Sequence, residues 1–454
     1  MSKALLIVSL AAALCAPACS SSDSSAGDSD DLTSNTALAR KLRFQGVVYV
    51  DEGTTDDGIV AIVKKQTQSA FGAFRTSNVG VNTRELGAVD PSTFSKKVVD
   101  VVDPANPAAP AQRKLRVQYT YTDDAVVPKT MATRSSLSLG LLNPNYGSQV
   151  PRITLECTAN DEHAHEFQSA LWYVFDPSRD SCKTAMTAEQ QAIDADRARA
   201  HVVAPDTLVT SEVNRLYVPM TASLTPAATN EGKSYPEYDR LYRGGVQPGK
   251  LVISQVNGLL ADWAAGEQMK VEEDTGYTGF WEVLEEILRA RPGFKLVSST
   301  PHEDLTTFTA AGVTVSNVTI DQIVQWQAHR TGFPATVTTQ AQRDALRAEV
   351  ARKTAKHWLS FELPVTVKIG QDAPSPFVIQ YNGYLGAETD STPHKQALKN
   401  SDVVIYEGHS YIGYGPLDPT RYSAADFPSS YQMLFFNSCV SFNYYEKDFF
   451  EMKV

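Results

Sequence analysis

Two short apolar stretches near the end of the chain, Val403-Val404-Ile405-Tyr406 and Met433-Leu434-Phe435-Phe436, decide the fold that the sequence predicts. Both have the length and the β-rich composition of strands buried on both faces, as in parallel sheets covered by helices. The first leads into Glu407-Gly408-His409-Ser410, and the second leads into Asn437-Ser438-Cys439. Functional groups in such sheets collect beyond the carboxyl ends of the strands. If the two strands are neighbours, the histidine and the cysteine meet at that edge.

The sequence before these stretches alternates between strand patterns and helix patterns. We expect strands at residues 251–256, 294–298, 358–369 and 377–384, and helices at residues 280–290, 340–356 and 394–399. The strand that ends at residue 384, the short helix after it and the strand at 403–406 have the order of a βαβ unit. This alternation predicts that residues 246–454 form an α/β region, with a mostly parallel sheet and helices on both faces.

The first half of the chain predicts a different architecture. Strands are expected at residues 44–50, 97–102 and 115–122, and helices at about residues 54–74 and 186–200. Thr54-Thr55-Asp56-Asp57 can cap the first of these helices, which then places Ile59, Ile62 and Val63 on one face. Residues 41–245 are therefore predicted to form an α+β region. They carry no recognisable catalytic pattern.

The start of the chain has the features of an export signal. Lys3 precedes an apolar stretch over residues 4–14, which is too short to span a bilayer. The following Ala16-Pro17-Ala18-Cys19 resembles the lipobox of bacterial lipoproteins, although Leu is usual where Ala16 stands. Lipidation of Cys15, or cleavage of a plain secretory signal before a disordered leader, is an alternative.

The lipobox resemblance has consequences for location. It implies a signal peptide over residues 1–18, lipidation of Cys19, and a Ser- and Asp-rich flexible tether over residues 19–40. The expected location is the cell envelope of a Gram-negative bacterium, with the chain lipid-anchored to the outer membrane and facing the periplasm or the surface. The membrane is thus one expected partner.

Three cysteines lie in the body of the protein. In an oxidising compartment Cys157 and Cys182 are close enough in sequence to form a disulfide, worth about 3 kcal/mol in the chain-entropy model. Cys439 is left unpaired. An unpaired thiol in an exported protein is either buried and inert or kept free because it reacts.

Composition and motifs exclude several classes of function. The net charge is −11, and the absence of a basic cluster argues against a nucleic-acid partner. His163 and His165 form a His-x-His pair, but on the helix expected there the two rings point about 200° apart. We therefore expect no metal site at this pair and no other cofactor.

The end of the chain resembles the caspase, gingipain and clostripain group of cysteine peptidases, whose signature is four apolar residues before a His-Gly and four more before the catalytic Cys. The resemblance covers about residues 377–445. It implies a caspase-like fold, His409 as the catalytic histidine, Cys439 as the nucleophile and a peptide or protein substrate. Backbone amides near Gly408 and Cys439 become candidates for the oxyanion site, and Ser410 and Asp418 are further oxyanion or pocket candidates. Ser410 stands where the family usually has Gly, and only fifteen residues follow the cysteine, where the family adds further strands.

Other interpretations of the same residues stay open. Gly408-His409-Ser410 also resembles the nucleophile turn of α/β-hydrolases, but Ile412 replaces the required Gly and no later histidine follows. The loop over residues 411–419 is either a rigid surface loop or a pocket wall in which Asp418 recognises a basic side chain. A catalytically inactive lipoprotein that acts as a binding or structural module is the competing function.

Overall fold

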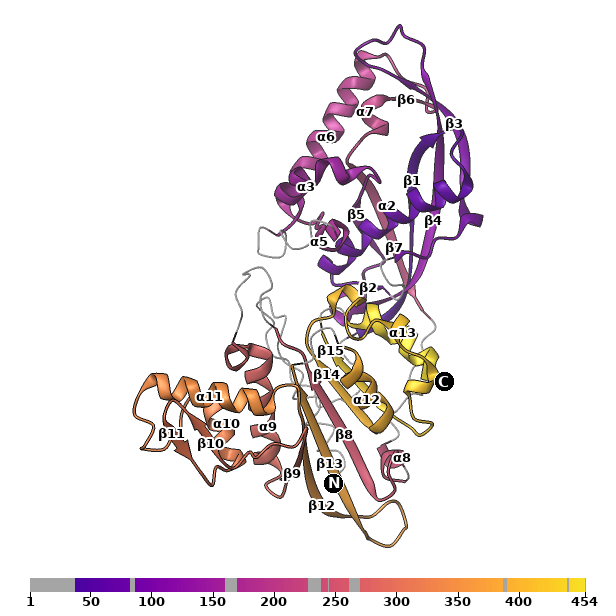
Figure 1. Cartoon of the computed structure of the whole chain (residues 1–454). Helices are drawn as coiled ribbons and strands as arrows, with labels where there is room; N and C mark the ends of the chain where they lie inside the picture. Colours follow the sequence, from indigo (N-terminus) through magenta and orange to yellow (C-terminus); the bar gives the residue numbers. More distant parts are fainter. Residues whose placement is uncertain are drawn as a thin grey trace. The chain divides into compact units, whose positions relative to one another are not determined.

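A computed structural model of the chain describes residues 37–81, 86–159, 170–227, 238–243, 245–260, 270–386, 390–438 and 441–453. These residues separate into two compact units, the first within residues 28–234 and the second from residue 235 onward. The sequence analysis placed the boundary eleven residues later, between 245 and 246. The two units are drawn in Figure 1 and are described one at a time.

The first unit is built on one sheet. Its elements are β1 (Ala37–Asp51), α2 (Asp56–Thr76), β2 (Gly80–Val81), β3 (Ser95–Val102), β4 (Gln112–Pro128), β5 (Ser136–Leu142), α3 (Val150–Cys157), α5 (Leu171–Val174), α6 (Asp180–Arg199), β6 (Thr207–Val209), α7 (Thr210–Val213) and β7 (Tyr217–Pro226). The strand order is β5-β7-β1-β4-β3-β6, with β2 beside β4, and every pairing except β3 with β6 is antiparallel. The predicted α+β architecture of this half is confirmed.

Helix α2 covers one face of this sheet because its sequence fixes both its start and its buried side. The Thr55 hydroxyl accepts a hydrogen bond from the Gly58 N–H at 3.2 Å, which satisfies one of the free N–H groups of the first turn. Side chains of the buried face pack on the sheet, where the Phe74 ring lies 5.9 Å from that of Phe44 and the Phe44 ring lies 5.2 Å from that of Tyr121.

A disulfide joins Cys157, at the end of α3, to Cys182, in the first turns of α6. Both cysteines are fully buried. The pairing predicted from the sequence is therefore confirmed.

The second unit contains a six-stranded sheet. Its elements are α8 (Tyr238–Tyr242), β8 (Lys250–Asn257), α9 (Thr275–Ala290), β9 (Lys295–Thr300), β10 (Phe308–Ala310), β11 (Val313–Val315), α10 (Ile320–Ala328), α11 (Gln340–Thr354), β12 (Trp358–Val367), β13 (Ser375–Leu385), α12 (Thr392–Asn400), β14 (Val403–Glu407), β15 (Met433–Asn437) and α13 (Ser441–Lys453). The strand order is β15-β14-β8-β13-β12-β9, so β15 lies at one edge of the described sheet.

The sheet is mixed. Strands β15, β14, β8 and β13 are parallel, whereas β12 runs antiparallel to both of its neighbours. The prediction of a mostly parallel sheet therefore holds for four strands and is wrong for the β13-β12-β9 side. Residues 368–374 alone connect β12 to β13, and so short a connection allows only an antiparallel pair, since a parallel pair needs a long crossover.

Helices cover both faces of the parallel strands, as predicted for the second half of the chain. On one face the Phe280 ring of α9 lies over Gly383 of β13, where a Cβ atom would come within 2.4 Å of the ring. On the other face α12 and α13 contact β14 and β15, with the His394 ring 5.2 Å from that of Tyr406 and the Tyr445 ring 5.6 Å from that of Phe436 (Figure 1).

Candidate active site

The candidate site lies at the carboxyl edge of three adjacent parallel strands. Strand β14 pairs with β15 on one side and with β8 on the other, and this register sets Glu407 opposite both Asn437 and Asn257. His409 follows the paired residue of β14 by two positions, and Cys439 follows that of β15 by two. The condition stated for the two strands, that they are neighbours, is met, and they are parallel. Cys439 itself lies outside the described residues, as does Cys19.

The turn that carries His409 is held by three hydrogen bonds. The Gly258 N–H donates to the Glu407 carbonyl at 2.7 Å, the Gly408 N–H donates to the Asn437 carbonyl at 3.3 Å, and the Tyr406 hydroxyl donates to the His409 carbonyl at 2.7 Å. A Cβ atom on Gly408 would lie 2.6 Å from the Tyr406 hydroxyl. Glycine is therefore needed here for the turn to close.

The residues after His409 are fixed in a compact loop. Ser410 is 4 % exposed, and its carbonyl accepts a hydrogen bond from the Tyr445 hydroxyl at 2.7 Å. The Asp418 carboxylate accepts bonds from the Thr420 N–H at 3.0 Å and the Thr420 hydroxyl at 2.9 Å, which caps a 3-10 turn. The rigid-loop interpretation of this segment thus has a structural basis. The role of Asp418 toward a basic substrate side chain stays a prediction.

A polar network that was not predicted from the sequence lies two residues before His409. Its centre is Glu407, whose Oε2 accepts a hydrogen bond from Asn257 Nδ2 at 3.3 Å and whose Oε1 accepts one from Asn437 Nδ2 at 3.4 Å. Gln255 Nε2 donates to Asn257 Oδ1 at 2.9 Å, and the Tyr381 hydroxyl donates to Gln255 Oε1 at 2.9 Å. The four parallel strands each contribute one or two of these groups.

Burial governs the electrostatics of this network. Desolvation raises the pKa of Glu407 above its ordinary value, and the hydrogen bonds from Asn257 and Asn437 partly oppose that rise. The amides thus support a carboxylate that burial disfavours. A half-buried carboxyl group with a raised pKa at the end of parallel strands is typical of a functional site.

A simple signal could have found these residues. The apolar runs of β8, β14 and β15 end in Asn257, Glu407 and Asn437, and strand ends at one edge of a parallel sheet lie close together. The site predicted from the sequence contained only residues that follow the strands, so the last residue of each strand was left out.

A second histidine, His394, packs against Tyr406 of β14, one residue before Glu407. His394, in the first turn of α12, is 2 % exposed, and its Nδ1 lies 3.1 Å from the Asp390 carbonyl. Its Nε2 has no hydrogen-bond partner among the residues that the structure describes. Desolvation lowers the pKa of His394 to about 4, so the ring is neutral at pH 7 and packs against Tyr406 as an apolar group.

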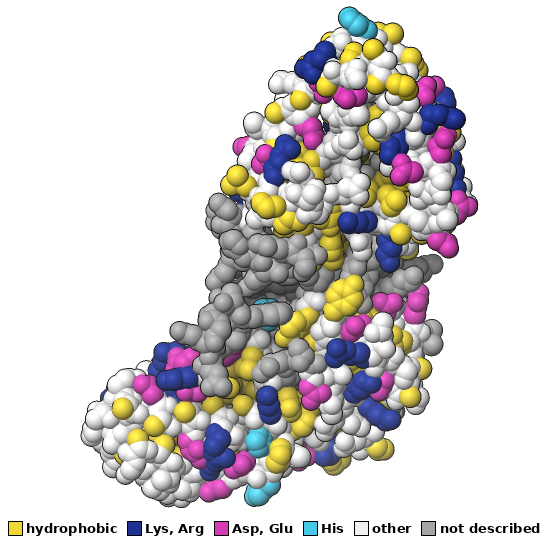
Figure 2. Space-filling view, turned by 45° about the horizontal axis from the view of Figure 1, so that its top comes forward, with side chains coloured by type: hydrophobic (Ala, Val, Ile, Leu, Met, Phe, Trp, Pro, Cys, Tyr) yellow, Lys and Arg dark blue, Asp and Glu magenta, His cyan; other side chains and the backbone are white. Residues whose placement is uncertain are grey.

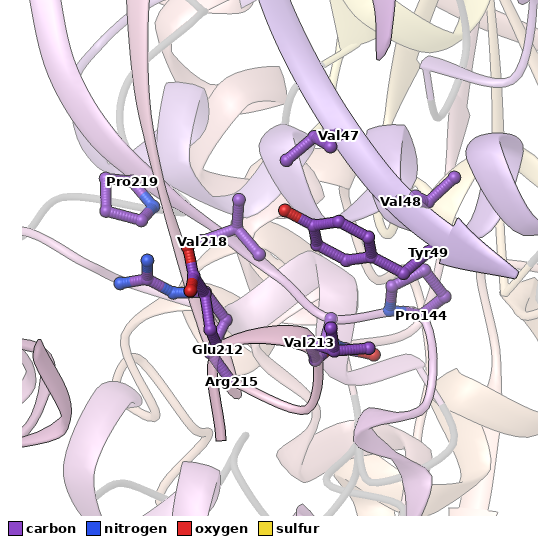
Figure 3. Close-up of a pocket in the computed structure, with 10 residues that line it drawn as sticks. Val47, Val48, Tyr49, Pro144, Glu212, Val213, Arg215, Val218 and Pro219 are labelled. Carbon is purple, nitrogen blue, oxygen red and sulfur yellow. The ribbon is translucent and has the colours of Figure 1, made fainter. Parts of the chain in front are cut away.

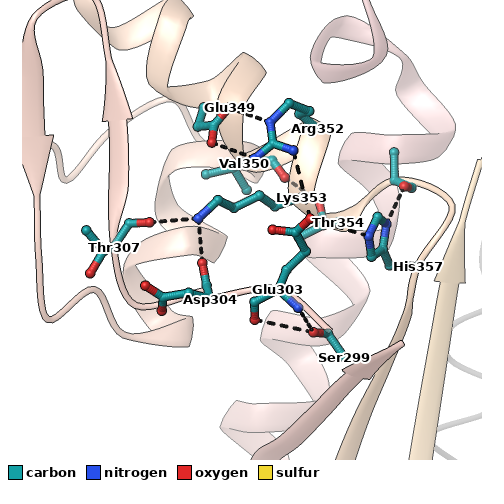
Figure 4. Close-up of polar contacts among 11 residues, drawn as sticks. Ser299, Glu303, Asp304, Thr307, Glu349, Val350, Arg352, Lys353, Thr354 and His357 are labelled. Carbon is teal, nitrogen blue, oxygen red and sulfur yellow. Dashed lines mark hydrogen bonds and ion pairs between the residues drawn. The ribbon is translucent and has the colours of Figure 1, made fainter. Parts of the chain in front are cut away.

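Another polar cluster in the second unit serves the fold (Figure 4). The Glu303 carboxylate lies 3.8 Å from Arg352 Nη1 and 4.0 Å from His357 Nε2, while Lys353 Nζ donates to the carbonyls of Asp304 at 2.6 Å and Thr307 at 2.9 Å. These contacts tie the segment after β9 to the end of α11. The polar groups of this cluster therefore stabilise the fold.

Other sequence expectations concern metals, membranes and charge. His163 and His165 lie outside the described residues, and within the described part no three His, Cys, Asp or Glu side chains are placed to hold a metal ion. No helix among the described residues combines the length and apolarity needed to cross a membrane. On the face drawn in Figure 2, Lys and Arg side chains are interspersed with Asp and Glu.

Comparisons of the chain with models of protein families, with curated proteins and with solved structures found no match. What this edge of the sheet does is therefore argued from its residues and their geometry.

Proposed function

We propose that the protein is an exported lipoprotein with a caspase-like second unit, and that it hydrolyses peptide bonds with Cys439 and His409. One observation carries the proposal: β14 and β15 pair in parallel and in register, and each ends two residues before one member of the pair. Two groups that follow neighbouring parallel strands at the same offset lie at the same edge of the sheet. A thiol peptidase needs a nucleophile and an imidazole, and this offset supports a shared location for both at that edge.

The chemistry follows from these two groups. The Cys439 thiolate attacks the carbonyl carbon of the scissile peptide bond, and the His409 imidazolium protonates the leaving amine, which leaves a thioester on the cysteine. Water then attacks the thioester, with His409 accepting its proton, and releases the acid. Backbone amides near Gly408 and Cys439 are the candidates for stabilising the oxyanion, although the Gly408 N–H already donates to Asn437.

The polar network gives Glu407 a supporting role in this proposal. Its carboxylate is two residues from His409 and is buried enough for its pKa to rise. A negative charge near the imidazole favours the imidazolium form, and hence the thiolate of an ion pair. The amides of Asn257 and Asn437 would keep that charge in place.

The test is the pH dependence of iodoacetamide labelling on protein lacking residues 1–19. Of the five cysteines, this protein retains the disulfide pair and Cys439, so labelling reports on one thiol. We expect labelling to persist well below the ordinary thiol pKa of about 8.5. The His409→Ala variant should lose this low-pH labelling, whereas His302→Ala, at an exposed histidine of the same unit, should keep it.

The competing function predicts a different result. In an inactive binding module the thiol labels slowly, or with an ordinary pH profile that is the same in all three proteins. That outcome would reject the peptidase proposal. A shifted profile that depends on His409 justifies a screen of peptide substrates, beginning with those that carry Lys or Arg next to the scissile bond, because Asp418 is the candidate acidic group of the pocket.

A further inference from the structure

The sheet of the first unit opens between two of its strands. Strands β1 and β7 pair from Arg40 with Pro226 to Phe44 with Ala222, and the pairing stops there although both strands continue. Beyond this point β1 stays paired with β4, and β7 stays paired with β5. The sheet therefore divides between β1 and β7.

A proline explains where the pairing stops. If the β1–β7 register continued, Pro219 would lie opposite Val47. The Arg43 carbonyl faces β7, where it accepts a hydrogen bond from the Ser223 hydroxyl, and residues at intervals of two share that side of the strand. Val47 therefore needs a donor at this position, and proline has none. The strands separate instead of leaving an incomplete ladder.

A cavity of about 290 Å³ occupies this opening (Figure 3). Its apolar wall consists of Val47, Val48, Pro144, Val213, Val218 and Pro219, and its polar wall consists of Tyr49, Asn143, Glu212 and Arg215. The volume lies just below the usual range for sites that bind drug-sized molecules, so it suits a small ligand, and the lining combines apolar side chains with a few polar groups that can orient one.

The polar groups of the cavity differ in whether other residues of the protein supply their ion-pair or hydrogen-bond partners. Glu212 forms an ion pair with Arg197 at 2.6 Å. Arg215 has only neutral acceptors, the Tyr217 carbonyl at 2.8 Å and Gln190 Oε1 at 3.1 Å, and it forms no ion pair within the described part of the chain. The Tyr49 hydroxyl has no hydrogen-bond partner among the described residues. In Figure 3 it points into the space between Val47 and Val218, on the side of Glu212 and Arg215.

We infer that this cavity binds a small carboxylate with a compact, branched apolar body. A guanidinium without an ion pair and a hydroxyl without an acceptor present donors that a carboxylate matches, and the valine and proline side chains match the apolar body. Desolvation lowers the pKa of Arg215 and raises that of Tyr49. A bound carboxylate stabilises the charged guanidinium, so it offsets the effect of burial on Arg215, and it accepts a hydrogen bond from the neutral Tyr49 hydroxyl. This site is independent of His409 and of the proposed peptidase function.

The probes are N-acetyl-L-leucine and its uncharged analogue N-acetyl-L-leucinamide. They share the branched apolar body and differ in the carboxylate. Binding of each to protein lacking residues 1–19 is followed by titration calorimetry and by amide chemical shifts in two-dimensional NMR spectra. We expect the acid to bind at least about tenfold more tightly than the amide, because a hydrogen bond between charged groups is stronger than its neutral counterpart.

Two variants assign the effect to the cavity. Arg215→Gln should remove the preference for the acid. Tyr49→Phe removes only the hydroxyl and should weaken binding of the acid by about fivefold, a typical loss for one hydrogen bond. Tyr146→Phe is the matched control, since Tyr146 belongs to the same unit and does not line the cavity, and it should leave binding unchanged.

The outcomes that overturn the inference are distinct. Equal affinity for the acid and the amide, or no binding of either at millimolar concentration, contradicts a carboxylate site. Acid-selective binding that Tyr49→Phe and Arg215→Gln leave intact would place the ligand elsewhere. If Arg215→Gln fails to fold by circular dichroism, Tyr49→Phe alone decides. A hexapeptide that ends in leucine distinguishes the source of the carboxylate: binding equal to that of N-acetyl-L-leucine indicates peptide termini, and weaker binding indicates free small acids.

Discussion

The two units place their polar residues in different ways because their strands run in different directions. In the second unit, parallel strands end at one edge, so the last residues of β8, β14 and β15 come together there as Asn257, Glu407 and Asn437. In the first unit, antiparallel strands alternate in direction, and polar groups gather instead where β1 and β7 separate. In this protein the polar groups therefore gather at the end of the parallel strands and between two strands of the antiparallel sheet.

The units also differ in how they are held together. The first has a disulfide between two helices, whereas the second relies on packing of helices on both sheet faces and on polar groups buried without charge, such as His394. The predictions below separate these contributions, from the largest expected effect to the smallest.

Removing the disulfide should destabilise only the first unit. The bridge joins cysteines 25 residues apart, and the chain-entropy model assigns to such a loop about 3–3.5 kcal/mol. We expect Cys157→Ser combined with Cys182→Ser to lower the free energy of unfolding of the first unit by about this amount. Hydrogen exchange in urea, read on peptides from 37–227 and from 238–453, measures each unit. An unchanged midpoint for the first set of peptides would show that the cross-link adds nothing.

Because His394 is buried in its neutral form, the stability of the second unit should fall in acid. Its pKa is about 4 in the folded protein and about 6.5 in the unfolded chain, so between these values the unfolded chain binds more protons and stability falls as pH falls. The loss from pH 7 to pH 4 is up to about 3 kcal/mol from this residue. Other groups titrate in the same range, so the measured quantity is the difference from His394→Phe, which keeps a ring beside Tyr406.

The expected result is a difference in unfolding free energy that grows in favour of the variant as pH falls from 7 to 4, and that appears in peptides of the second unit. A difference that is constant with pH would mean that His394 does not control acid stability.

Sequence patterns predicted the helices and strands well where a local physical requirement determines them. The apolar runs before Glu407 and Asn437 became parallel strands, and Thr55 capped α2, because strand formation and N-terminal hydrogen bonding are local requirements. The expected burial on both faces is right for β14 and wrong for β15, whose residues are only partly buried because it lies at the edge of the described sheet. The direction of β12 was missed, because it depends on the short connection over residues 368–374 and not on the pattern of the strand itself.

The same distinction between local and long-range information applies to the candidate sites. His409 could be placed at a sheet edge from its sequence position. The network around Glu407 needed the pairing of β8, which is more than 140 residues earlier in the chain, with β14. The cavity in the first unit could not be predicted, because it depends on the register that brings Pro219 toward Val47, and sequence alone does not give the register between distant strands.

The two sheets share one packing device that allows a direct test. Gly46 of β1 lies under the Tyr119 ring and Gly383 of β13 lies under the Phe280 ring, where added Cβ atoms would come within 2.2 Å and 2.4 Å of ring atoms. Each Gly→Ala variant should lose about 1–3 kcal/mol by overpacking. Gly53→Ala and Gly279→Ala, where nothing lies within 4 Å, are the controls and should not destabilise.

Urea unfolding followed by hydrogen exchange then compares the two units. We expect each variant to destabilise the unit that contains it. If Gly383→Ala costs nothing while Gly46→Ala is destabilising, the second unit is the more loosely packed of the two, and α9 can move away from the sheet without loss.

The smallest effect concerns the carboxyl group at the candidate active site. Burial raises the pKa of Glu407, so between its unfolded and folded values the folded protein binds more protons, and the stability that this group contributes falls as pH rises. Glu407→Gln removes the charge and keeps acceptor and donor atoms near Asn257 and Asn437, so it should raise the free energy of unfolding slightly at pH 8 and lose this advantage toward pH 4. Glu362→Gln, at a partly exposed carboxylate of the same sheet that is paired with Lys250, is the control. If Glu407→Gln is instead the less stable protein at pH 8, the hydrogen bonds from the two asparagines outweigh the desolvation of the carboxylate. The polar network at the edge of the parallel strands would then contribute to stability.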